Sequence, residues 1–213
     1  MQFTEVTARL AALPDVFPPP PSALMPIRTD GVTDWRPTVS LDSLTTRPAS
    51  VLVLLFPDEA GEARVVLTER VDRGGHHSGE VSFPGGSAEA EDADVAATAV
   101  REAVEEVGLD VNGAGVRVIG QLEPFWIPVS NFRVTPILAL ADRRPTLVAN
   151  PAEVARIVEA PVHAFLPDGE IEIVERDVRG WPLRFGAYPI EGLRVWGATA
   201  RILGQLGALL AAD

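Results

Sequence analysis

The sequence contains no cysteine, which excludes a disulfide framework and thiol chemistry. Basic residues are scarce, 18 Lys and Arg against 30 Asp and Glu, and the net charge of −12 opposes sequence-independent binding to nucleic acid. No apolar run approaches the roughly 18 residues of a spanning helix, and the N-terminus lacks a basic segment followed by an apolar one. We therefore expect a cytoplasmic protein with no nucleic-acid or membrane partner.

The composition that is present describes an ordinary globular chain. Its 213 residues are 46% hydrophobic and 23% charged, enough for one substantial core. Residues 1–47 are interpreted as an N-terminal extension, with a short helix over 4–13 that the prolines at 18–21 prevent from continuing. Residues 48–213 are expected to form the compact domain.

Strand patterns alternate with two helical ones in this domain. Helical periodicity occurs over 94–107 and 196–211. The β-branched and apolar runs predict strands over 50–56, 63–68, 116–122, 134–140, 157–162, 170–178 and 183–188. This mixture favours an α/β sandwich over a helical bundle or an all-β fold.

The helix over 94–107 carries an unfavourable group of charges. An apolar side, expected to contain Ala96, Ala99, Val100, Ala103, Val104 and Val107, lies opposite Glu102, Glu105 and Glu106. Two such charges about 4 Å apart repel by ~1 kcal/mol in water and ~4 kcal/mol at a surface-like dielectric, and Arg101 offsets only part of this. Either the face is simply solvated, or a hard divalent cation binds these carboxylates.

The residues around these glutamates favour the cation. The run Arg101–Leu109, REAVEEVGL, together with Gly86, resembles the Nudix hydrolase signature G-x5-E-x7-R-E-U-x-E-E-x-G-U, where U is aliphatic. Gly86 lies one residue further from Arg101 than in that signature, and the glutamate position counted back from Arg101 falls on Ala93. Asp92, six residues after Gly86, restores the pattern if one residue is inserted, with Asp in place of Glu.

The resemblance implies a Nudix-type α/β/α sandwich with a mixed central sheet. It also implies hydrolysis of a nucleoside diphosphate linked to another group, by water attacking one phosphorus with the help of Mg²⁺ or Mn²⁺. The implied metal ligands are Glu102, Glu105, Glu106 and the carbonyl of Gly86, with Glu105 and Glu106 the better candidates for direct contact. Glu102 is a ligand, a base or both, and Arg101 orients the glutamates.

A second resemblance concerns the substrate. The segment from Leu67 to Gly86 is similar to the additional signature L-L-T-x-R-[SA]-x3-R-x3-G-x3-F-P-G-G of the coenzyme A pyrophosphatase branch, with its spacing preserved. Three specified positions differ, with Val66 in place of the first Leu, Val71 in place of Ser or Ala and Gly75 in place of the second Arg. The first two changes are mild, whereas the loss of the arginine removes a group able to hold a phosphate. Arg70, Arg73 and His77 are therefore the candidates for substrate binding, although a lone loop histidine more often has a solvated role.

Two segments outside the signatures are secondary candidates. The run Trp126–Phe132 is a polar and aromatic loop between strands, where recognition residues often lie. The run 150–154 is interpreted as a turn into a short helix that Glu153 would cap. Because many Nudix proteins use a further glutamate at the metals, Glu153 is also a candidate ligand.

These observations lead to one main hypothesis, metal-dependent cleavage of coenzyme A or its thioesters into 3',5'-ADP and 4'-phosphopantetheine derivatives. The first alternative is a Nudix hydrolase of another nucleoside diphosphate derivative, such as ADP-ribose, NADH or a dinucleoside polyphosphate. The second is an inactive Nudix-fold binding module, which would have no reason to retain repelling carboxylates. A homodimer is the expected assembly on general grounds, and no sequence feature identifies its interface.

Overall fold

The computed structural model describes residues 1–32, 45–71, 80–128, 130–178 and 180–212. Within these residues, a mixed eight-stranded sheet forms the centre of the molecule. Its strands are β2 (Arg47–Pro57), β3 (Ala63–Arg70), β4 (Val81–Ser82), β5 (Gly85–Ser87), β6 (Val116–Gln121), β7 (Phe125–Ile127), β8 (Phe132–Ala141) and β9 (Val154–Pro161). The order is β4-β3-β2-β8-β6, with β5 on β2, β7 on β8 and β9 on β3. Among the described strands of this sheet, only β2 and β8 pair in parallel, which makes the sheet mixed.

The sheet divides between β2 and β3. These strands pair only between Leu55–Pro57 and Ala63–Val65. Further along, β2 pairs with β5, while β3 pairs with β4 on one edge and β9 on the other. The backbone of β5, which contains Gly85 and Gly86, therefore lies at the place where the two halves of the sheet separate.

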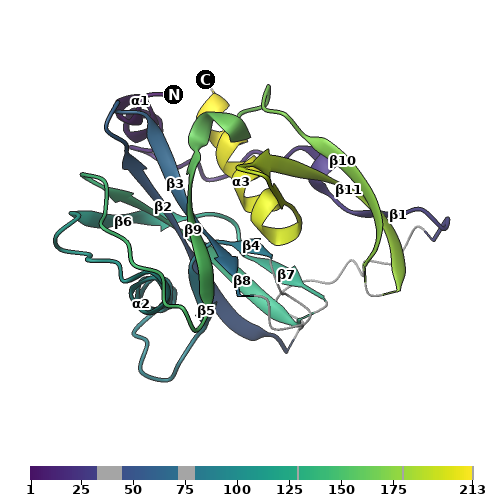
Figure 1. Ribbon diagram of the computed structural model, residues 1–213, viewed down its shortest axis with the longest axis horizontal. Coiled ribbons are helices and arrows are strands. Elements are labelled where there is room, and N and C mark those ends of the chain that lie inside the picture. Colours follow the sequence, from purple (N-terminus) through teal and green to yellow (C-terminus); the bar gives the residue numbers. More distant parts are fainter. Residues whose placement is uncertain (33–44, 72–79, 129, 179, 213) are drawn as a thin grey trace.

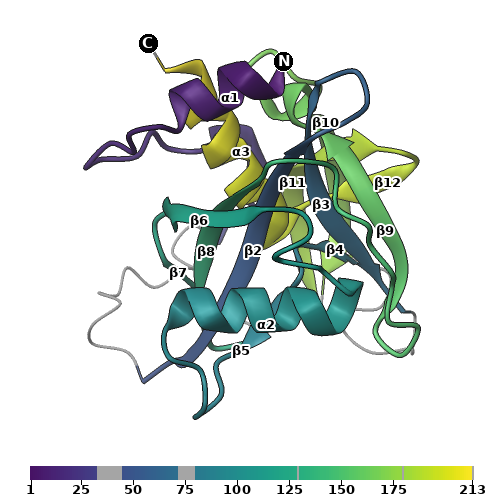
Figure 2. The ribbon, with the colours of Figure 1, turned by 90° about the vertical axis from the view of Figure 1, so that its left-hand side faces the viewer.

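Helices cover the two faces of this sheet. Helix α2 (Val95–Val107) packs on one face, against a cluster that includes Leu52, Leu54 and Ile137. Helix α3 (Gly197–Ala211) packs on the other face within the larger core cluster. Figure 1 shows the two helices on opposite sides of the strands, and Figure 2 shows α2 lying across the near face. The predicted α/β/α sandwich with a mixed sheet is thus confirmed.

A smaller antiparallel sheet lies beyond α3, and the sequence did not predict it as a separate unit. Its order is β1 (Ile27–Arg28), β11 (Trp181–Ile190) and β10 (Glu172–Val178), with β12 (Leu193–Val195) on β11. Trp196 precedes α3 and stacks on Phe185 of β11, with ring centroids 4.7 Å apart. This contact fastens the start of α3 to the second sheet.

Most of the longer predicted elements are present, with shifted ends. The sequence missed the short strands β1, β4, β5, β7 and β12, because two or three residues carry no measurable period. The 3₁₀ helices η1 (Ser22–Leu24) and η3 (Val162–Phe165) were missed as well. No helix of the described ranges is both long and apolar enough to cross a membrane.

The N-terminal segment packs into the same core as the domain. Helix α1 spans Phe3–Arg9, shorter than the predicted 4–13. Val6, Leu10 and Leu24 are almost fully buried in the core cluster on the α3 face. The division at residue 47 stays a prediction about domain boundaries, but the described part of residues 1–47 contributes directly to the stability of the fold.

Candidate functional site

Both ends of α2 are fixed by local hydrogen bonds. The side chain of Asp94 accepts a hydrogen bond from the Ala97 N–H at 2.8 Å, which caps the first turn. Gly108 adopts a left-handed conformation with φ of 61°, and its N–H donates to the Val104 carbonyl at 3.0 Å. The start and end of the helix are therefore determined, and with them the directions of its glutamates.

The buried side of α2 includes a carboxylate, contrary to the sequence analysis. Ala99 and Ala103 are fully buried, and Glu106 beside them is only 4% exposed. Val104, which was expected on the apolar side, is instead 45% exposed. The spacing explains the correction, because Glu106 follows Ala103 by three residues and Ala99 by seven, the intervals of a single helical stripe.

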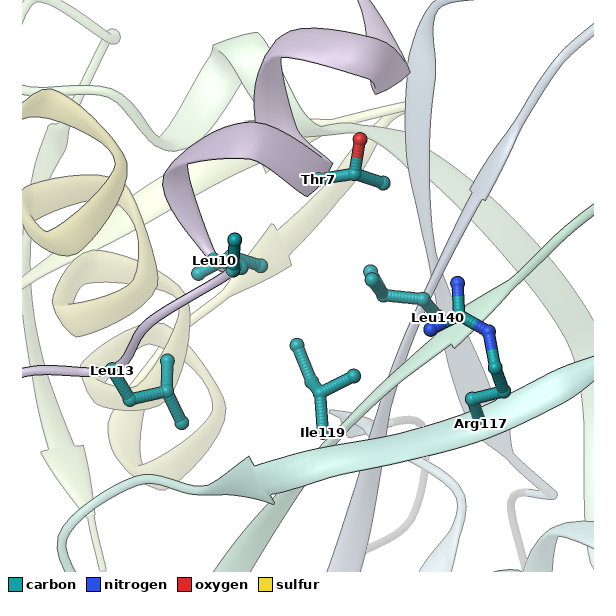
Figure 3. Close-up of a pocket in the computed structure, with 7 residues that line it drawn as sticks. Thr7, Leu10, Leu13, Arg117, Ile119 and Leu140 are labelled. Carbon is teal, nitrogen blue, oxygen red and sulfur yellow. The ribbon is translucent and has the colours of Figure 1, made fainter.

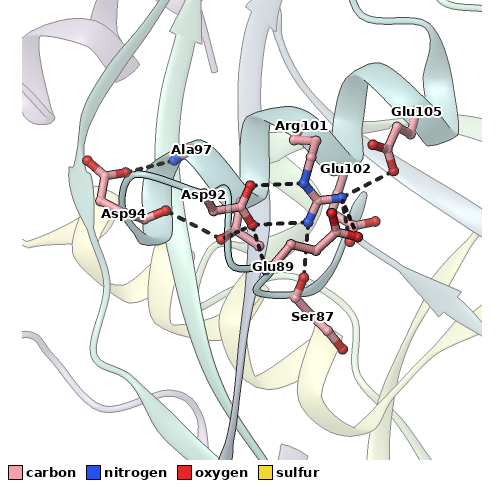
Figure 4. Close-up of polar contacts among 9 residues, drawn as sticks. Ser87, Glu89, Asp92, Asp94, Ala97, Arg101, Glu102 and Glu105 are labelled. Carbon is pink, nitrogen blue, oxygen red and sulfur yellow. Dashed lines mark hydrogen bonds and ion pairs between the residues drawn. The ribbon is translucent and has the colours of Figure 1, made fainter.

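Arg101 is the centre of the polar contacts around α2 (Figure 4). Its guanidinium donates to Asp92 at 2.9 and 3.1 Å and to the Ser87 carbonyl at 3.0 Å. It also donates to Glu102 and Glu105, each at 3.2 Å. The predicted orienting contact of Arg101 with the glutamates is therefore present in the structure.

Asp92, which the sequence left without a definite role, is the main partner of Arg101. Its carboxylate also accepts hydrogen bonds from the Glu89 N–H at 2.9 Å and the Thr98 hydroxyl at 2.8 Å. These contacts, the Arg101 bond above all, hold the pKa of Asp92 well below its usual range. Asp92 thus joins the loop before α2 to the arginine and keeps that arginine in place.

Two carboxylates face the glycines of β5. The Gly85 N–H donates to Glu106 Oε2 at 3.3 Å. Burial raises the pKa of Glu106 to about 7, and the charges of Glu102 and Glu153 add to the increase, while Arg70 and the Gly85 N–H oppose it. The pKa of Glu102 is also raised, first by burial, although Arg101 opposes the change. Their carboxyl groups are therefore costly to ionise in the absence of a further cation.

The charge of Glu153 acts on Glu102 and Glu106, but the local structure around Glu153 differs from the prediction. No short helix follows residue 150; a turn leads directly into β9. Asn150 organises the turn, because its side-chain oxygen accepts the Ala152 N–H at 3.1 Å and its own N–H donates to the Glu106 carbonyl at 2.8 Å. The turn is thereby tied to the end of α2, and the capping role proposed for Glu153 is wrong.

Gly86 is required by its closeness to a glutamate. A Cβ atom added to Gly86 would lie 2.3 Å from Glu102 Oε1, far inside van der Waals contact. The glycine therefore lets the Glu102 carboxylate lie directly against the backbone of β5. The predicted role of the Gly86 carbonyl as a metal ligand stays a prediction.

The comparisons with known proteins agree with this arrangement. A family model described as the NUDIX domain matches residues 46–178 of the chain. The chain belongs to the Nudix family. Nudix hydrolase 15, mitochondrial, of Arabidopsis thaliana is 38% identical over 168 residues, 76% of this chain and 58% of that protein. The uncharacterized Nudix hydrolase NudL of Photorhabdus laumondii is 38% identical over 142 residues, 67% of this chain and 74% of that protein.

Solved structures also match part of the chain. The MutT/nudix family protein from Enterococcus faecalis has a TM-score of 0.49 and 16% identity, with 76% of this chain and 61% of that chain covered. The chain studied here spans 58% of the length of the plant relative. The family membership rests on the family model and on the relatives in sequence.

The carboxylate oxygens of α2 suit a hard divalent cation such as Mg²⁺ or Mn²⁺. The carboxylates of Glu102 and Glu106 are withdrawn from water beside the Gly85–Gly86 backbone, and burial raises the pKa of each. A nearby cation would lower both pKa values again. Among the described residues, no three Asp, Glu or His side chains are spaced to hold an ion. The donor chemistry therefore fits the cation, and these side chains would have to converge on it.

Glu105 differs from the other two glutamates of the motif. Its side chain is 54% exposed and is held by Arg101 at 3.2 Å. From the sequence, Glu105 and Glu106 were the better candidates for direct contact with the metal. The burial of these side chains instead favours Glu102 and Glu106, which lie against β5.

The predicted substrate-binding residues are only partly within the structure. Arg73 and His77 lie outside the described residues, so their roles stay predictions. Arg70 ends β3, and its charge acts on Glu106, where it opposes the rise in pKa. Arg70 thus lies close enough for its charge to act on Glu106, and its predicted substrate-binding role stays a prediction.

A pocket elsewhere in the fold has no catalytic chemistry. It has a volume of about 390 Å³ and lies between α1 and β6 (Figure 3). It is lined by Thr7, Leu10, Ala11, Leu13, Arg117, Ile119 and Leu140. No carboxylate lines it, so the glutamates of α2 and not this pocket form the candidate site.

We expect Gly86→Ala to impair turnover without unfolding the protein. The added methyl group meets the flexible end of Glu102, so the carboxylate moves, and stability should change by less than about 1 kcal/mol. Turnover should fall roughly tenfold or more. Gly113→Ala is a matched control, because its Cβ would meet the Asp110 carboxylate at 2.1 Å away from α2. Equal activity of the two variants would contradict the role of Gly86.

The metal-free protein should lose stability as the pH rises. The folded-state pKa of Glu106 is about 7 and the reference value is 4.5, so its stabilising contribution is complete below 4.5 and is lost as pH passes 7. This carboxyl should make unfolding about 3 kcal/mol easier at pH 8.5 than at pH 4. Denaturant unfolding of the wild type and of Glu106→Gln measures the effect, and the variant should lack this component. An identical pH dependence in both proteins would refute the assignment.

Proposed function

We propose that this chain is a metal-dependent Nudix pyrophosphohydrolase acting on a nucleoside diphosphate derivative. The observation that carries the proposal is the burial of Glu106 beside Glu102 and the β5 glycines, with both carboxyl pKa values raised. Such an arrangement costs folding free energy unless a cation or substrate uses it. The family membership supports the same class of reaction.

Each residue of the site has a distinct proposed role. Glu102, Glu106 and the Gly86 carbonyl would hold Mg²⁺ or Mn²⁺, with Glu105 and Glu153 contributing from the periphery. When bound, the cation supplies neutralisation of the diphosphate oxygens and activation of water. Arg101, held by Asp92, keeps the glutamates in their directions.

The raised pKa of Glu102 also suits it to proton transfer. A carboxylate with a pKa nearer neutrality is a stronger base than a solvated one and can accept a proton from the attacking water. Arg70, whose charge acts on Glu106, would contact the diphosphate of the substrate.

For the substrate we propose coenzyme A or its thioesters, cleaved to 3',5'-ADP and 4'-phosphopantetheine derivatives. The support is the segment from Leu67 to Gly86, which resembles the coenzyme A branch signature and ends in the β5 glycines that contact Glu102. Gly75 is the departure that keeps ADP-ribose, NADH and dinucleoside polyphosphates as alternatives.

A substrate panel tests the proposal. The protein is incubated with coenzyme A, acetyl-coenzyme A, ADP-ribose, NADH and a dinucleoside polyphosphate, with Mg²⁺ or Mn²⁺, and products are identified by mass. The expected result is 3',5'-ADP from coenzyme A, absent with Glu106→Gln. Cleavage of another compound alone would replace the substrate, and no cleavage at all would favour a binding module.

A further inference from the structure

The hairpin of β7 and β8 is held in an unusual conformation. Asn131 lies between the strands with φ of 56°, a left-handed backbone that few residues other than glycine adopt. Its side-chain oxygen accepts the Trp126 indole N–H and its side-chain nitrogen donates to the Thr45 carbonyl, each at 3.1 Å. Its own carbonyl accepts the Arg47 N–H at 2.9 Å. These bonds fix the hairpin relative to the start of β2.

Two arginines lie over aromatic rings of this hairpin. The guanidinium carbon of Arg47 is 4.5 Å from the centroid of Phe132, and that of Arg201, on α3, is 4.5 Å from the centroid of Phe125. Because Ile127 is opposite Phe132 in the antiparallel pairing, Phe125 and Phe132 lie on the same face as diagonal neighbours. Such diagonal positions are about 7–8 Å apart, so the two cations approach one region.

Neither arginine has an acidic partner within the described part of the chain. No ion pair or side-chain hydrogen bond joins either guanidinium to a protein group there, although the sequence has 30 acidic residues. Arg201 is partly withdrawn from water, and burial lowers its pKa, which only the more distant charge of Glu123 opposes. Within the described residues, no protein group therefore accepts a hydrogen bond from its guanidinium.

We propose that Arg47 and Arg201 together bind a phosphate group of the substrate remote from the diphosphate that is cleaved. Stacking on Phe132 and Phe125 fixes the planes of the two guanidinium groups and leaves their edges free to donate to phosphate oxygens. A phosphate dianion between them also removes the repulsion of the two cations. The proposal rests on the proposed function, which supplies a phosphorylated substrate.

The position along β2 agrees with this ligand. Ser50 is opposite Gly86 of β5, and Arg47 precedes Ser50 by three residues. At about 3.3 Å per residue, the two positions are about 10 Å apart, a length comparable to one nucleotide unit. Because residues three apart on a strand point to opposite faces, Arg47 lies on the α3 face with Arg201. A substrate with its diphosphate at Glu102 and Glu106 would reach both arginines by passing the place beside β5 where the two halves of the sheet separate.

Equilibrium binding of defined nucleotides tests the proposal independently of turnover. Titration calorimetry with adenosine 3',5'-bisphosphate and with 5'-AMP is performed on the wild type, Arg47→Gln, Arg201→Gln and Arg201→Lys. The wild type should bind the bisphosphate at least tenfold more tightly than 5'-AMP. Each Gln variant should lose roughly tenfold in its affinity for the bisphosphate and little in its affinity for 5'-AMP. Arg201→Lys should fall between, because it keeps the charge and loses the planar fork.

Arg117→Gln is the matched control, since Arg117 is an exposed arginine paired with Asp142 on β6. It should bind both nucleotides as the wild type does. Equal affinity of the wild type for the two nucleotides, or an unchanged bisphosphate affinity in both Gln variants with native unfolding curves, overturns the proposal. If the arginine dependence holds while the substrate panel shows no cleavage of coenzyme A, the phosphate site stands and the proposed substrate fails.

Discussion

Replacing Glu106 by glutamine is expected to lower metal-dependent kcat/KM by roughly 10²- to 10³-fold, while the protein remains folded. The change keeps the shape of the side chain and its contact with the Gly85 N–H, and removes only the negative charge. Because Glu106 is 4% exposed and surrounded by α2 and β5, no other carboxylate can easily take its place. The measurement is kcat/KM with Mg²⁺, accompanied by an unfolding curve.

Glu105→Gln is the control for this result. It makes the same chemical change one residue away, at a side chain that is 54% exposed and held by Arg101. We expect a loss at least tenfold smaller than for Glu106→Gln, because a peripheral carboxylate contributes less to the charge at the cation. An equal loss in two folded variants would show that burial does not distinguish the ligands, and would restore Glu105 as a direct one.

Removal of divalent cations should abolish turnover, with an effect as large as that of Glu106→Gln. In excess chelator the described residues offer the carboxylates of Glu102 and Glu106 only the charges of Arg101 and Arg70, and the cation that would neutralise the diphosphate and acidify the attacking water is gone. Added Mg²⁺ or Mn²⁺ should restore activity, more completely above pH 7 than below it. The sign follows from Glu106, whose pKa of about 7 means that it must lose its proton to bind a cation well.

Thermal unfolding provides the second readout of the metal. Mg²⁺ should raise the Tm of the wild type at pH 8 and raise that of Glu106→Gln much less, because only binding to the folded state stabilises it. Full activity in chelator would reject the metal-dependent mechanism. An equal Tm increase in both proteins would place the cation elsewhere than at Glu106.

The central elements of the fold could be predicted because their signals are local. The period of the helix over 94–107, its Gly108 end and the apolar runs of β2 and β3 each depend on neighbouring residues. The second sheet could not be predicted in this way. Its strands β1 and β11 are far apart in sequence, and only their pairing makes β1 a strand.

The sequence by itself determined the family and the residue types of the site, because the spacing of Arg101, Glu102, Glu105 and Glu106 is written in one short segment. Only the tertiary structure decided which of these carboxylates is buried. The packing of α2 on β2 and β5 withdraws Glu106 from water and leaves Val104 exposed. On an isolated helix, both side chains would be equally accessible to solvent. It also decided that Asp92 holds Arg101, since that contact depends on how the loop before α2 folds back on the helix.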